Sequence, residues 1–378
     1  MLSRRLAYVI DELEVGGTQR QLLEMASGLM GRGWQVDVIV LQPILTMAPE
    51  FRAVGIPLYH MPKRRLLDLG LILALRRFFR ERRIGIVHAF SSTAEFFASI
   101  AARTCGCCFI ASVRGFNDTL PVIHALGKRV ACRLAAVVVA NSEAGGQRAV
   151  ATRVATAGKL RVIPNGLRLV ALPATKERQT IRRSLGCSDE TCLIASVGRL
   201  VPEKGCEITI DVARLVLARG LRARFVIAGD GPLRGEVERR IAQIGIAESM
   251  LLVGERRDIP ALLSAADIYL STSRSEGMSN SVMEAMGLGL PVVASAVGGT
   301  PELIASGDTG LLFPPGDSAA AAETLITLIE SPSLRRALGE RGRAFVEARH
   351  SLEAMVEELE SLYGALLASR LVSRGRVS

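Results

Sequence analysis

Two carboxylates lie close together in a serine-rich stretch of the second half of the chain. Glu276 precedes the run Ser279 to Ser281, and Glu284 follows it within a mostly apolar segment. Short polar side chains of this kind commonly begin a helix. Amide N–H groups at a helix start attract phosphate oxygens, while a carboxylate outside the helix accepts hydrogen bonds from hydroxyl groups. The stretch therefore predicts a ligand with both phosphate and hydroxyl groups, such as a nucleotide sugar.

The same residues also allow a purely structural interpretation. In a capping box of the pattern Ser281-x-x-Glu284, the glutamate bonds an amide of its own helix and not a ligand. This stretch alone leaves both interpretations open, so the other loops decide between them.

Three further loops carry residues suited to a phosphate ligand. Arg199 and Lys204 follow an apolar run and precede a helical pattern, where two cations can straddle a diphosphate; solvated surface charge is the alternative. Gly231 and Gly254 follow the next two apolar runs, and small residues there allow a ligand to approach the backbone. The loop around Gly231 resembles a relaxed dinucleotide loop. NAD is not expected, however, because no acidic residue ends the next strand at the required distance.

Short apolar runs alternate with helical patterns along the whole chain, which predicts an α/β protein. Such strands are typical of parallel sheets buried on both faces, and doubly wound sheets of this type bind ligands at the carboxyl ends of their strands. The expected strands are residues 6–10, 36–41, 84–90, 108–113, 136–140 and 161–163, followed by 192–197, 224–228, 250–253, 267–271, 291–295 and 310–313.

The length of 378 residues suits two domains better than one core. We expect an N-terminal doubly wound domain over residues 1–170 and a linker over 171–190, where Pro173 and mixed charges occur. A second doubly wound domain is expected over 191–345. Residues 346–378 then form a C-terminal segment with an amphipathic, acidic helix and a basic tail.

The net charge of +10 is concentrated in the first part of the chain. Residues 1–170 contain 23 Lys and Arg against 11 Asp and Glu, so an anionic surface or acceptor belongs with this half. Lys63 to Arg83 form a basic and apolar segment, which predicts either a helix on a membrane surface or a core helix with arginines in its last turn. Nucleic-acid binding is not expected, since only 4% of residues are aromatic.

No apolar window is long enough to span a bilayer, and the first residues show no signal-peptide pattern. The sequence thus predicts a cytoplasmic protein that can work at the inner face of the cytoplasmic membrane. Seven scattered cysteines and four histidines show no ligand spacing, so no metal site is expected.

Three places in the first half are candidate site positions. Gly16 and Gly17 lie in a loop after the first strand, and Thr18 is expected to begin the helix that follows. His88 ends a strand and either assists donor or acceptor, or packs within the domain. Arg114 follows the next strand in the sequence Val113-Arg114-Gly115.

Together these loops resemble glycosyltransferase family 4, retaining enzymes of GT-B architecture with two Rossmann-like domains that face each other across a cleft. The resemblance spans about the whole chain and is strongest in the second half. It also implies that the helix within residues 346–378 crosses back onto the first domain. The motifs that carry it are Gly16-Gly17, Asn141-Ser142, Ile163 to Gly166, Gly198-Arg199-Leu200, Glu203-Lys204-Gly205, Gly229 to Pro232, Glu276-x7-Glu284, Pro291 to Ser295, Gly298 to Glu302 and Gly310-Leu311-Leu312.

The resemblance implies a role for each donor-side residue. Arg199 and Lys204 bind the diphosphate and stabilise it as it leaves, while Glu284 holds the ribose hydroxyls and Glu276 those of the transferred sugar. Catalytic candidates are Glu276, Arg199, Lys204 and His88. The donor-binding set is Gly16, Gly17, Arg199, Lys204, Gly231, Gly254, Glu276, Ser279, Asn280, Ser281 and Glu284.

The implied function is metal-independent, retaining transfer from a UDP- or GDP-linked sugar to a lipid-linked or polysaccharide acceptor in cell-surface glycan biosynthesis, with no further cofactor. A nucleotide-sugar epimerase and a non-catalytic nucleotide-sugar binder are the alternatives. The chain departs from many relatives at Arg114, where they carry histidine. Because arginine cannot act as a base at neutral pH, Arg114 is expected to contact the donor phosphates or an anionic acceptor.

Overall fold

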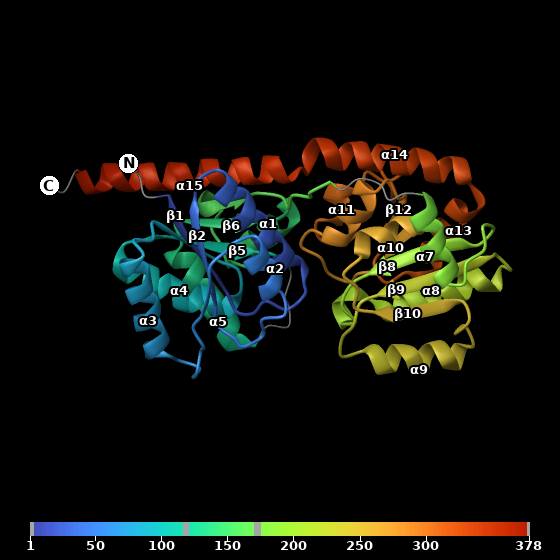
Figure 1. The fold of residues 1–378 in the computed structure, drawn as a ribbon, viewed down its shortest axis with the longest axis horizontal. Helices are drawn as coiled ribbons and strands as arrows, with labels where there is room; N and C mark the ends of the chain where they lie inside the picture. The colour runs from blue at the N-terminus through green and yellow to red at the C-terminus, as the bar shows by residue number, and fades with distance from the viewer. Residues whose placement is uncertain (1–3, 116–120, 170–174, 376–378) are drawn as a thin grey trace. The chain divides into compact units, whose positions relative to one another are not determined.

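The structure is a computed structural model that describes residues 4–115, 121–169 and 175–375. The chain forms two compact units (Figure 1). Unit 1 contains residues 1–166 and 352–378, and unit 2 contains residues 167–351. The fold class predicted from the sequence, two doubly wound α/β units, is confirmed.

Unit 1 is built on a parallel sheet. Among the described residues its seven strands lie in the order β3-β2-β1-β4-β5-β6-β7, so the strand order changes direction between β1 and β4. In such sheets ligands bind at the carboxyl edge near this switch point. The strands are β1 (Arg5–Ile10), β2 (Gln35–Val40), β3 (Leu58–His60), β4 (Ile86–Ala89), β5 (Cys108–Val113), β6 (Val137–Ala140) and β7 (Leu160–Val162).

Helices cover both faces of the unit 1 sheet because its strands are apolar on both sides. One face packs against α1 (Gly17–Gly31), α2 (Ala48–Ala53) and the C-terminal helix α15 (Leu352–Gly375). The other face packs against α3 (Leu69–Glu81), α4 (Ser92–Cys105), α5 (Val122–Leu134) and α6 (Glu143–Ala151).

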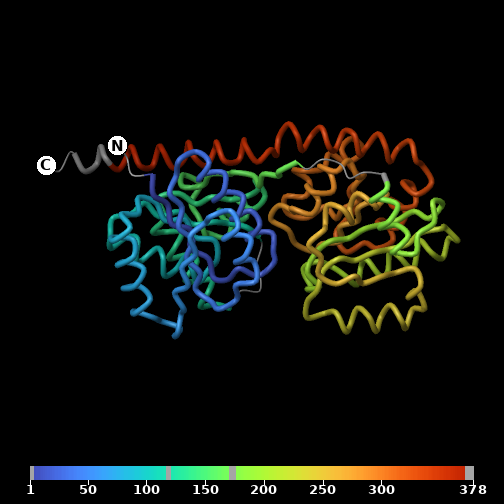
Figure 2. The backbone as a smooth tube through the Cα atoms, in the orientation of Figure 1, coloured from blue at the N-terminus to red at the C-terminus, as the bar shows by residue number. Residues whose placement is uncertain are grey.

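The C-terminal helix α15 belongs to unit 1, along which it lies beside α1 (Figure 2). Glu360 on this helix accepts hydrogen bonds from Arg4 and Arg32, both at 3.1 Å, and from Trp34 at 3.2 Å. The acidic helix thus meets basic side chains from the start of the chain. No helix of the described residues combines the length and the apolar composition needed to cross a bilayer.

Unit 2 repeats the same architecture. Its six described strands lie in the order β10-β9-β8-β11-β12-β13. They are β8 (Cys192–Val197), β9 (Ala223–Ala228), β10 (Met250–Gly254), β11 (Ile268–Ser271), β12 (Val292–Ser295) and β13 (Leu311–Phe313). One face packs against α8 (Cys206–Ala218), α9 (Arg234–Ile244) and α13 (Ser318–Glu330), and the other against α7 (Thr175–Ser184), α10 (Ile259–Ala265), α11 (Asn280–Gly287) and α12 (Thr300–Leu303). Helix α14 (Pro332–Arg349) contributes to both layers.

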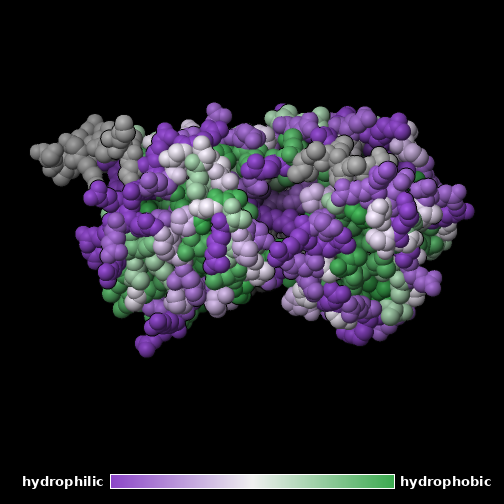
Figure 3. Space-filling view, viewed as in Figure 1, coloured by the Kyte–Doolittle hydropathy of each residue, from purple (hydrophilic) through white to green (hydrophobic). Residues whose placement is uncertain are grey.

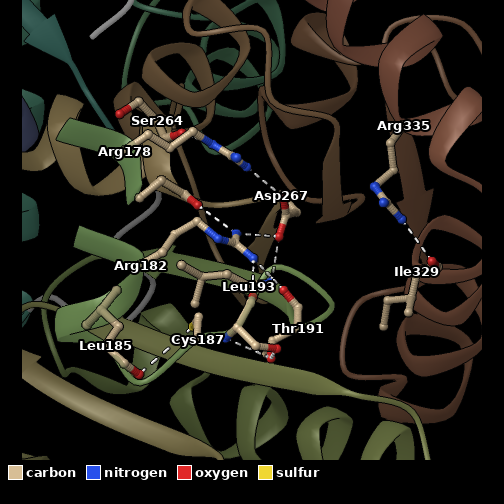
Figure 4. Close-up of polar contacts among 12 residues, drawn as sticks. Arg178, Arg182, Leu185, Cys187, Thr191, Leu193, Ser264, Asp267, Ile329 and Arg335 are labelled. Atoms are coloured by element: carbon tan, nitrogen blue, oxygen red, sulfur yellow. Dashed lines mark hydrogen bonds and ion pairs between the residues drawn. The ribbon is translucent and has the colours of Figure 1, made fainter. Parts of the chain in front are cut away.

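The region expected as a linker contains helix α7, which packs on unit 2. Arg178 and Arg182 of α7 both bond the carboxylate of Asp267 at 2.8 Å (Figure 4). The second oxygen of this carboxylate also accepts the amide of Leu193 at 2.8 Å, which joins α7 to β8 and to the start of β11. Residues 170–174 of the expected linker and the end of the expected basic tail, 376–378, lie outside the described residues.

Candidate functional site

The loops that follow β8, β9, β10 and β11 are bonded to one another at the carboxyl edge of the unit 2 sheet. The amide of Leu200 donates to the carbonyl of Asp230 at 2.9 Å. Gly229 donates to Gly254 at 2.8 Å in the same way. This edge is where a doubly wound sheet binds its ligand, so the bonded loops form one candidate site.

Glycines make this close approach of the loops possible. Gly205 has φ of +62°, and a side chain there would place its Cβ 2.2 Å from the carbonyl oxygen of Thr272. At Gly231 a Cβ would lie 2.6 Å from the carbonyl oxygen of Leu200. The predicted close approach at Gly231 is therefore a contact between two loops, and its contact with a donor stays a prediction.

Lys204 and Glu276 meet at this edge, although 72 residues separate them in the sequence. The ammonium group of Lys204 lies 2.5 Å from Oε1 of Glu276. Ser273 donates to the same carboxylate oxygen at 2.7 Å. The Glu276 side chain is 10% exposed and that of Lys204 29%, so both groups are partly desolvated yet accessible to a ligand. The pair offers a cation to phosphate and a fixed carboxylate to hydroxyl groups.

Glu284 lies on α11 near the same group of side chains. The hydroxyl of Tyr269 is buried, which raises its pKa, and this hydroxyl also lies near Ser281 and close enough to Glu276 and Glu284 to feel both negative charges. Both carboxylates thus act on one buried hydroxyl.

The N-cap of α11 is Ser279, and its side chain makes no capping hydrogen bond. Ser281 is already the second residue of the helix, so the capping box Ser281-x-x-Glu284 considered as an alternative does not form. Residues 280–282 lie in the first turn, whose amides have no carbonyl of the same helix to bond. The helix start therefore has the geometry that suits an anion.

Arg199 lies in the loop after β8 and is exposed. Its loop is held by the bond from Leu200 to Asp230, which keeps the arginine at the same sheet edge as Lys204. The described structure thus brings Lys204 and Glu276 into contact, with Glu284 nearby, and places Arg199 in the same connection between β8 and α8 as Lys204. A direct contact of these residues with a donor stays a prediction.

His88 occupies a buried position in unit 1. Its Nδ1 lies 2.7 Å from the hydroxyl of Tyr363 on α15, and its Nε2 lies 2.8 Å from the hydroxyl of Ser112. The residue has no exposed surface. Of the two alternatives considered for His88, this placement favours a packed histidine over one that contacts a substrate.

We expect His88 to make the stability of unit 1 depend on pH. Burial, with the positive charges of Arg114 and Lys128 nearby, holds the pKa of His88 well below 6.5. Below about pH 6.5 the imidazole of His88 therefore binds a proton in the unfolded chain but not in the folded chain. Its contribution to the free energy of unfolding is complete above this pH and declines as the pH falls. The expected maximal slope is about 1.4 kcal/mol per pH unit.

Urea denaturation followed by Trp34 fluorescence checks this expectation. Between about pH 7.5 and pH 5.5 the free energy of unfolding should fall more steeply for the wild type than for His88→Gln. Equal slopes for the two proteins would show that His88 does not exclude a proton in the folded state.

Arg114 directs its guanidinium into unit 1. One terminal nitrogen donates to Oδ1 of Asn165 at 2.9 Å, and the guanidinium carbon lies 5.2 Å from the ring centroid of Phe90. Burial lowers the pKa of Arg114 to about 10, and the nearby hydroxyls of Tyr363 and Tyr8 oppose this shift. The structure gives Arg114 partners within the protein, so its expected contact with a phosphate or an acceptor stays a prediction.

Gly16 and Gly17 follow β1 as predicted, but α1 begins at Gly17, one residue before the expected start at Thr18. Gly16 is the N-cap, with extended backbone and no side chain to cap the helix. Both glycines lie at the carboxyl edge of the unit 1 sheet, where a doubly wound sheet can bind a ligand.

Two residues of the unit 2 site were missed by sequence reasoning. Ser273 fixes Glu276, and the hydroxyl of Ser295 at the end of β12 donates to the backbone carbonyl of Ser273. The position of Ser273 three residues before Glu276, in a loop that follows a buried strand, is the sequence signal that could have found it. The bond from Ser295 has no such signal, because 22 residues separate its two partners.

Comparison with known proteins bears on both units. The model for Glycosyltransferase Family 4 matches residues 15–170, and that for Glycosyl transferases group 1 matches residues 177–345. The alpha-D-kanosaminyltransferase of Streptomyces kanamyceticus is 32% identical over 188 residues, which is 49% of this chain and 48% of that protein. The chain thus spans about half the length of this relative.

A second relative aligns along nearly the whole chain. The UDP-Gal:alpha-D-GlcNAc-diphosphoundecaprenol alpha-1,3-galactosyltransferase of Escherichia coli is 24% identical over 95% of this chain and 96% of that protein. Among solved structures, Anabaena HepE in complex with UDP and glucose superimposes with a TM-score of 0.85 at 23% identity, covering 96% of this chain and 99% of that one. With its two halves matched by the two models, the chain belongs to the glycosyltransferases of family 4.

Proposed function

We propose that the chain transfers a sugar from a UDP- or GDP-linked donor to a lipid-linked or polysaccharide acceptor in cell-surface glycan biosynthesis. The observation that carries this proposal is the pair of Lys204 and Glu276 at the carboxyl edge of the unit 2 sheet. A cation beside a fixed carboxylate fits a ligand that joins a diphosphate to a sugar. The family supports sugar transfer, and the acceptor named for the E. coli relative supports a lipid-linked acceptor.

The proposed chemistry is retaining and independent of metal. As the bond between sugar and diphosphate breaks, negative charge grows on the leaving phosphate, and Lys204, Arg199 and the start of α11 stabilise it. Glu276 orients the sugar through its hydroxyls, and Glu284 orients the ribose. The acceptor hydroxyl attacks from the face that the phosphate leaves, and its proton passes to that phosphate. The positive groups near the diphosphate thus supply the stabilisation that a metal would otherwise give.

Thermal denaturation with a set of nucleotide sugars tests donor binding. A ligand that binds only the folded state stabilises it by about 2.7 kcal/mol at a hundred times its Kd. We expect sugars linked to one of the nucleotides UDP, GDP and ADP to raise the melting temperature of the wild type by several degrees. The Lys204→Ala variant should not show this shift. If no nucleotide sugar raises the melting temperature, the proposed function is wrong.

An acceptor-dependence assay separates the alternatives. A transferase consumes the donor at an appreciable rate only with an acceptor, whereas a nucleotide-sugar epimerase converts the donor alone. A non-catalytic binder shows the thermal shift without turnover in either assay.

We further propose that the enzyme works at the inner face of the cytoplasmic membrane. The basic first half of the chain supports this location, because anionic lipid attracts clustered Lys and Arg side chains. The start of the segment from Lys63 to Arg83 is the region expected to contact the membrane.

A further inference from the structure

Exposed apolar side chains lie at the starts of two helices of unit 1. Seven large apolar residues there are exposed, which is unusual because most such side chains in this unit are buried. Leu67 is 70% exposed and Val122 86%. We call this set the apolar face, and it consists of Leu66, Leu67, Leu69, Leu73, Val122, Ile123 and Leu126.

The fold places both parts of the apolar face at one edge of unit 1. All strands of this sheet are parallel, so α3, α4 and α5 run in the opposite direction and all begin at the carboxyl edge. Both α3 and α5 pack against α4, which lies between them and starts with the polar residues Ser91 to Thr93. The edge is also where a doubly wound sheet binds ligands. In Figure 3 hydrophobic surface alternates with hydrophilic surface over this part of unit 1, where Figure 1 shows the three helices.

The turn before α3 holds its leucines outward. Asp68 is the N-cap of α3, and its carboxylate accepts the amides of Arg64 at 2.8 Å and Leu71 at 3.0 Å. These two bonds close the turn that contains Leu66 and Leu67. The backbone that carries the exposed leucines is therefore held by the fold, which lowers the cost of ordering it against a partner.

The rest of α3 does not lie on a membrane along its length. Its apolar stripe, which includes Leu71, Leu75 and Phe79, packs into the core of unit 1. Near its end, Arg77 pairs with Glu81, and Arg82 packs over the ring of Tyr59. The segment from Lys63 to Arg83 thus behaves as a core helix, as one of the two sequence interpretations held, and only its beginning is left for an outside partner.

The charge around the apolar face favours an anionic partner. Lys63, Arg64 and Arg65 precede α3, where Asp68 is already used as its cap. Residues 121–134 contain the exposed Arg129 and Arg133 and no acidic residue, whereas their Lys128 is paired with the buried Glu95. Apolar side chains surrounded by cations are the pattern of proteins that bind anionic bilayers.

We propose that the apolar face docks on the surface of an anionic bilayer, end-on through the starts of α3 and α5. Its leucines and valine enter the boundary between headgroups and acyl chains, and Arg64 and Arg65 contact the lipid phosphates. This inference deepens the proposed function, since it brings the carboxyl edge of unit 1 to the surface that carries a lipid-linked acceptor. Docking itself needs no donor.

Vesicle sedimentation of the full chain tests this proposal. The vesicles are equal parts phosphatidylglycerol and phosphatidylcholine, with pure phosphatidylcholine for comparison, at low salt. We expect the wild type to pellet with the anionic vesicles and the Leu67→Asp/Val122→Asp variant to bind at least about ten times more weakly. The matched control, Ile44→Asp/Val54→Asp, adds the same charge at exposed apolar residues outside the apolar face and should bind as the wild type does.

Three results would overturn the proposal. The first is that the wild type does not bind anionic vesicles. The second is that the variant and its control bind equally well. The third is that the wild type forms a dimer that Leu67→Asp/Val122→Asp separates, while no form binds lipid. The last result would make the apolar face an interface between two copies of the chain. Melting temperatures of all forms show that they are folded, and the donor-induced thermal shift should be the same in each. A protein that binds vesicles but no nucleotide sugar leaves docking intact and contradicts only the proposed function.

Discussion

Replacing Lys204 with alanine is expected to lower kcat for sugar transfer by about a hundred- to a thousand-fold. This range is typical when one group that stabilises developing negative charge is removed from a preorganised site. Lys204 is already oriented by Glu276 at 2.5 Å, so the cation needs little rearrangement to meet a leaving phosphate. The measurement is initial transfer rate at saturating donor. Lys176→Ala, at an exposed lysine on α7, is the control and should leave kcat unchanged.

A double-mutant cycle with Glu276→Gln tests whether the two residues act as a unit. Because Lys204 and Glu276 are in direct contact, the double variant should lose clearly less activity than the two single losses multiplied together. Independent, multiplicative losses would argue that the contact has no part in turnover. A kcat for Lys204→Ala within about threefold of the wild type would refute the role of this cation in stabilising the leaving group.

The second large effect concerns the stability of unit 2. We expect Asp267→Ala to lower its free energy of unfolding by about 3–5 kcal/mol, as is usual when one partner of a buried ion pair is removed. The Arg182 side chain is only 6% exposed and would lose its carboxylate while it stays buried. Arg178 and the amide of Leu193 would lose the same partner (Figure 4).

Urea denaturation can assign this loss to one unit. The single tryptophan, Trp34, lies in unit 1, whereas circular dichroism reports on both units. In Asp267→Ala the dichroism transition should begin at lower urea than the fluorescence transition. Asp308→Ala is the control, because Asp308 pairs with Arg341 on the surface and is 65% exposed, and it should cost less than about 1 kcal/mol. Unchanged dichroism in Asp267→Ala would contradict the role assigned to this network.

The candidate site could be predicted because its parts lie in loops that directly follow apolar strands. Once a parallel sheet is assumed, the ends of β8 and β11 must lie at the same edge, which brings Lys204 near Glu276. The sequence did not indicate that Ser273 would bond the same carboxylate oxygen as Lys204. Such detail depends on side-chain geometry, which residue spacing does not define.

Two errors in the expected fold have clear physical causes. The sequence of α7 is almost entirely polar and shows no repeating pattern of apolar residues. This helix is attached to unit 2 largely through the bonds of Arg178 and Arg182 to Asp267. Its polar composition was therefore taken for a linker. Strand β3 was missed because it has only three residues, Leu58–His60, at the edge of the sheet.

The environments of His88 and Arg114 could not be predicted from local sequence. The partner of His88, Tyr363, lies 275 residues further along the chain on α15. Asn165, the partner of Arg114, lies 51 residues away beyond β7. A strand-end histidine looks like a substrate ligand until the helix that covers it is known.

The return of α15 to unit 1 also affects how the protein is made. Residues 1–166 leave the ribosome long before α15, which supplies Leu359 and Tyr363 to the same hydrophobic core as Tyr8 and Trp34. Unit 2 is an insertion between these two segments and can fold during synthesis, since domains generally fold as units as they emerge. The first unit to be translated is thus the last to be completed, and its nascent chain exposes an apolar surface that chaperones can recognise until α15 has been made.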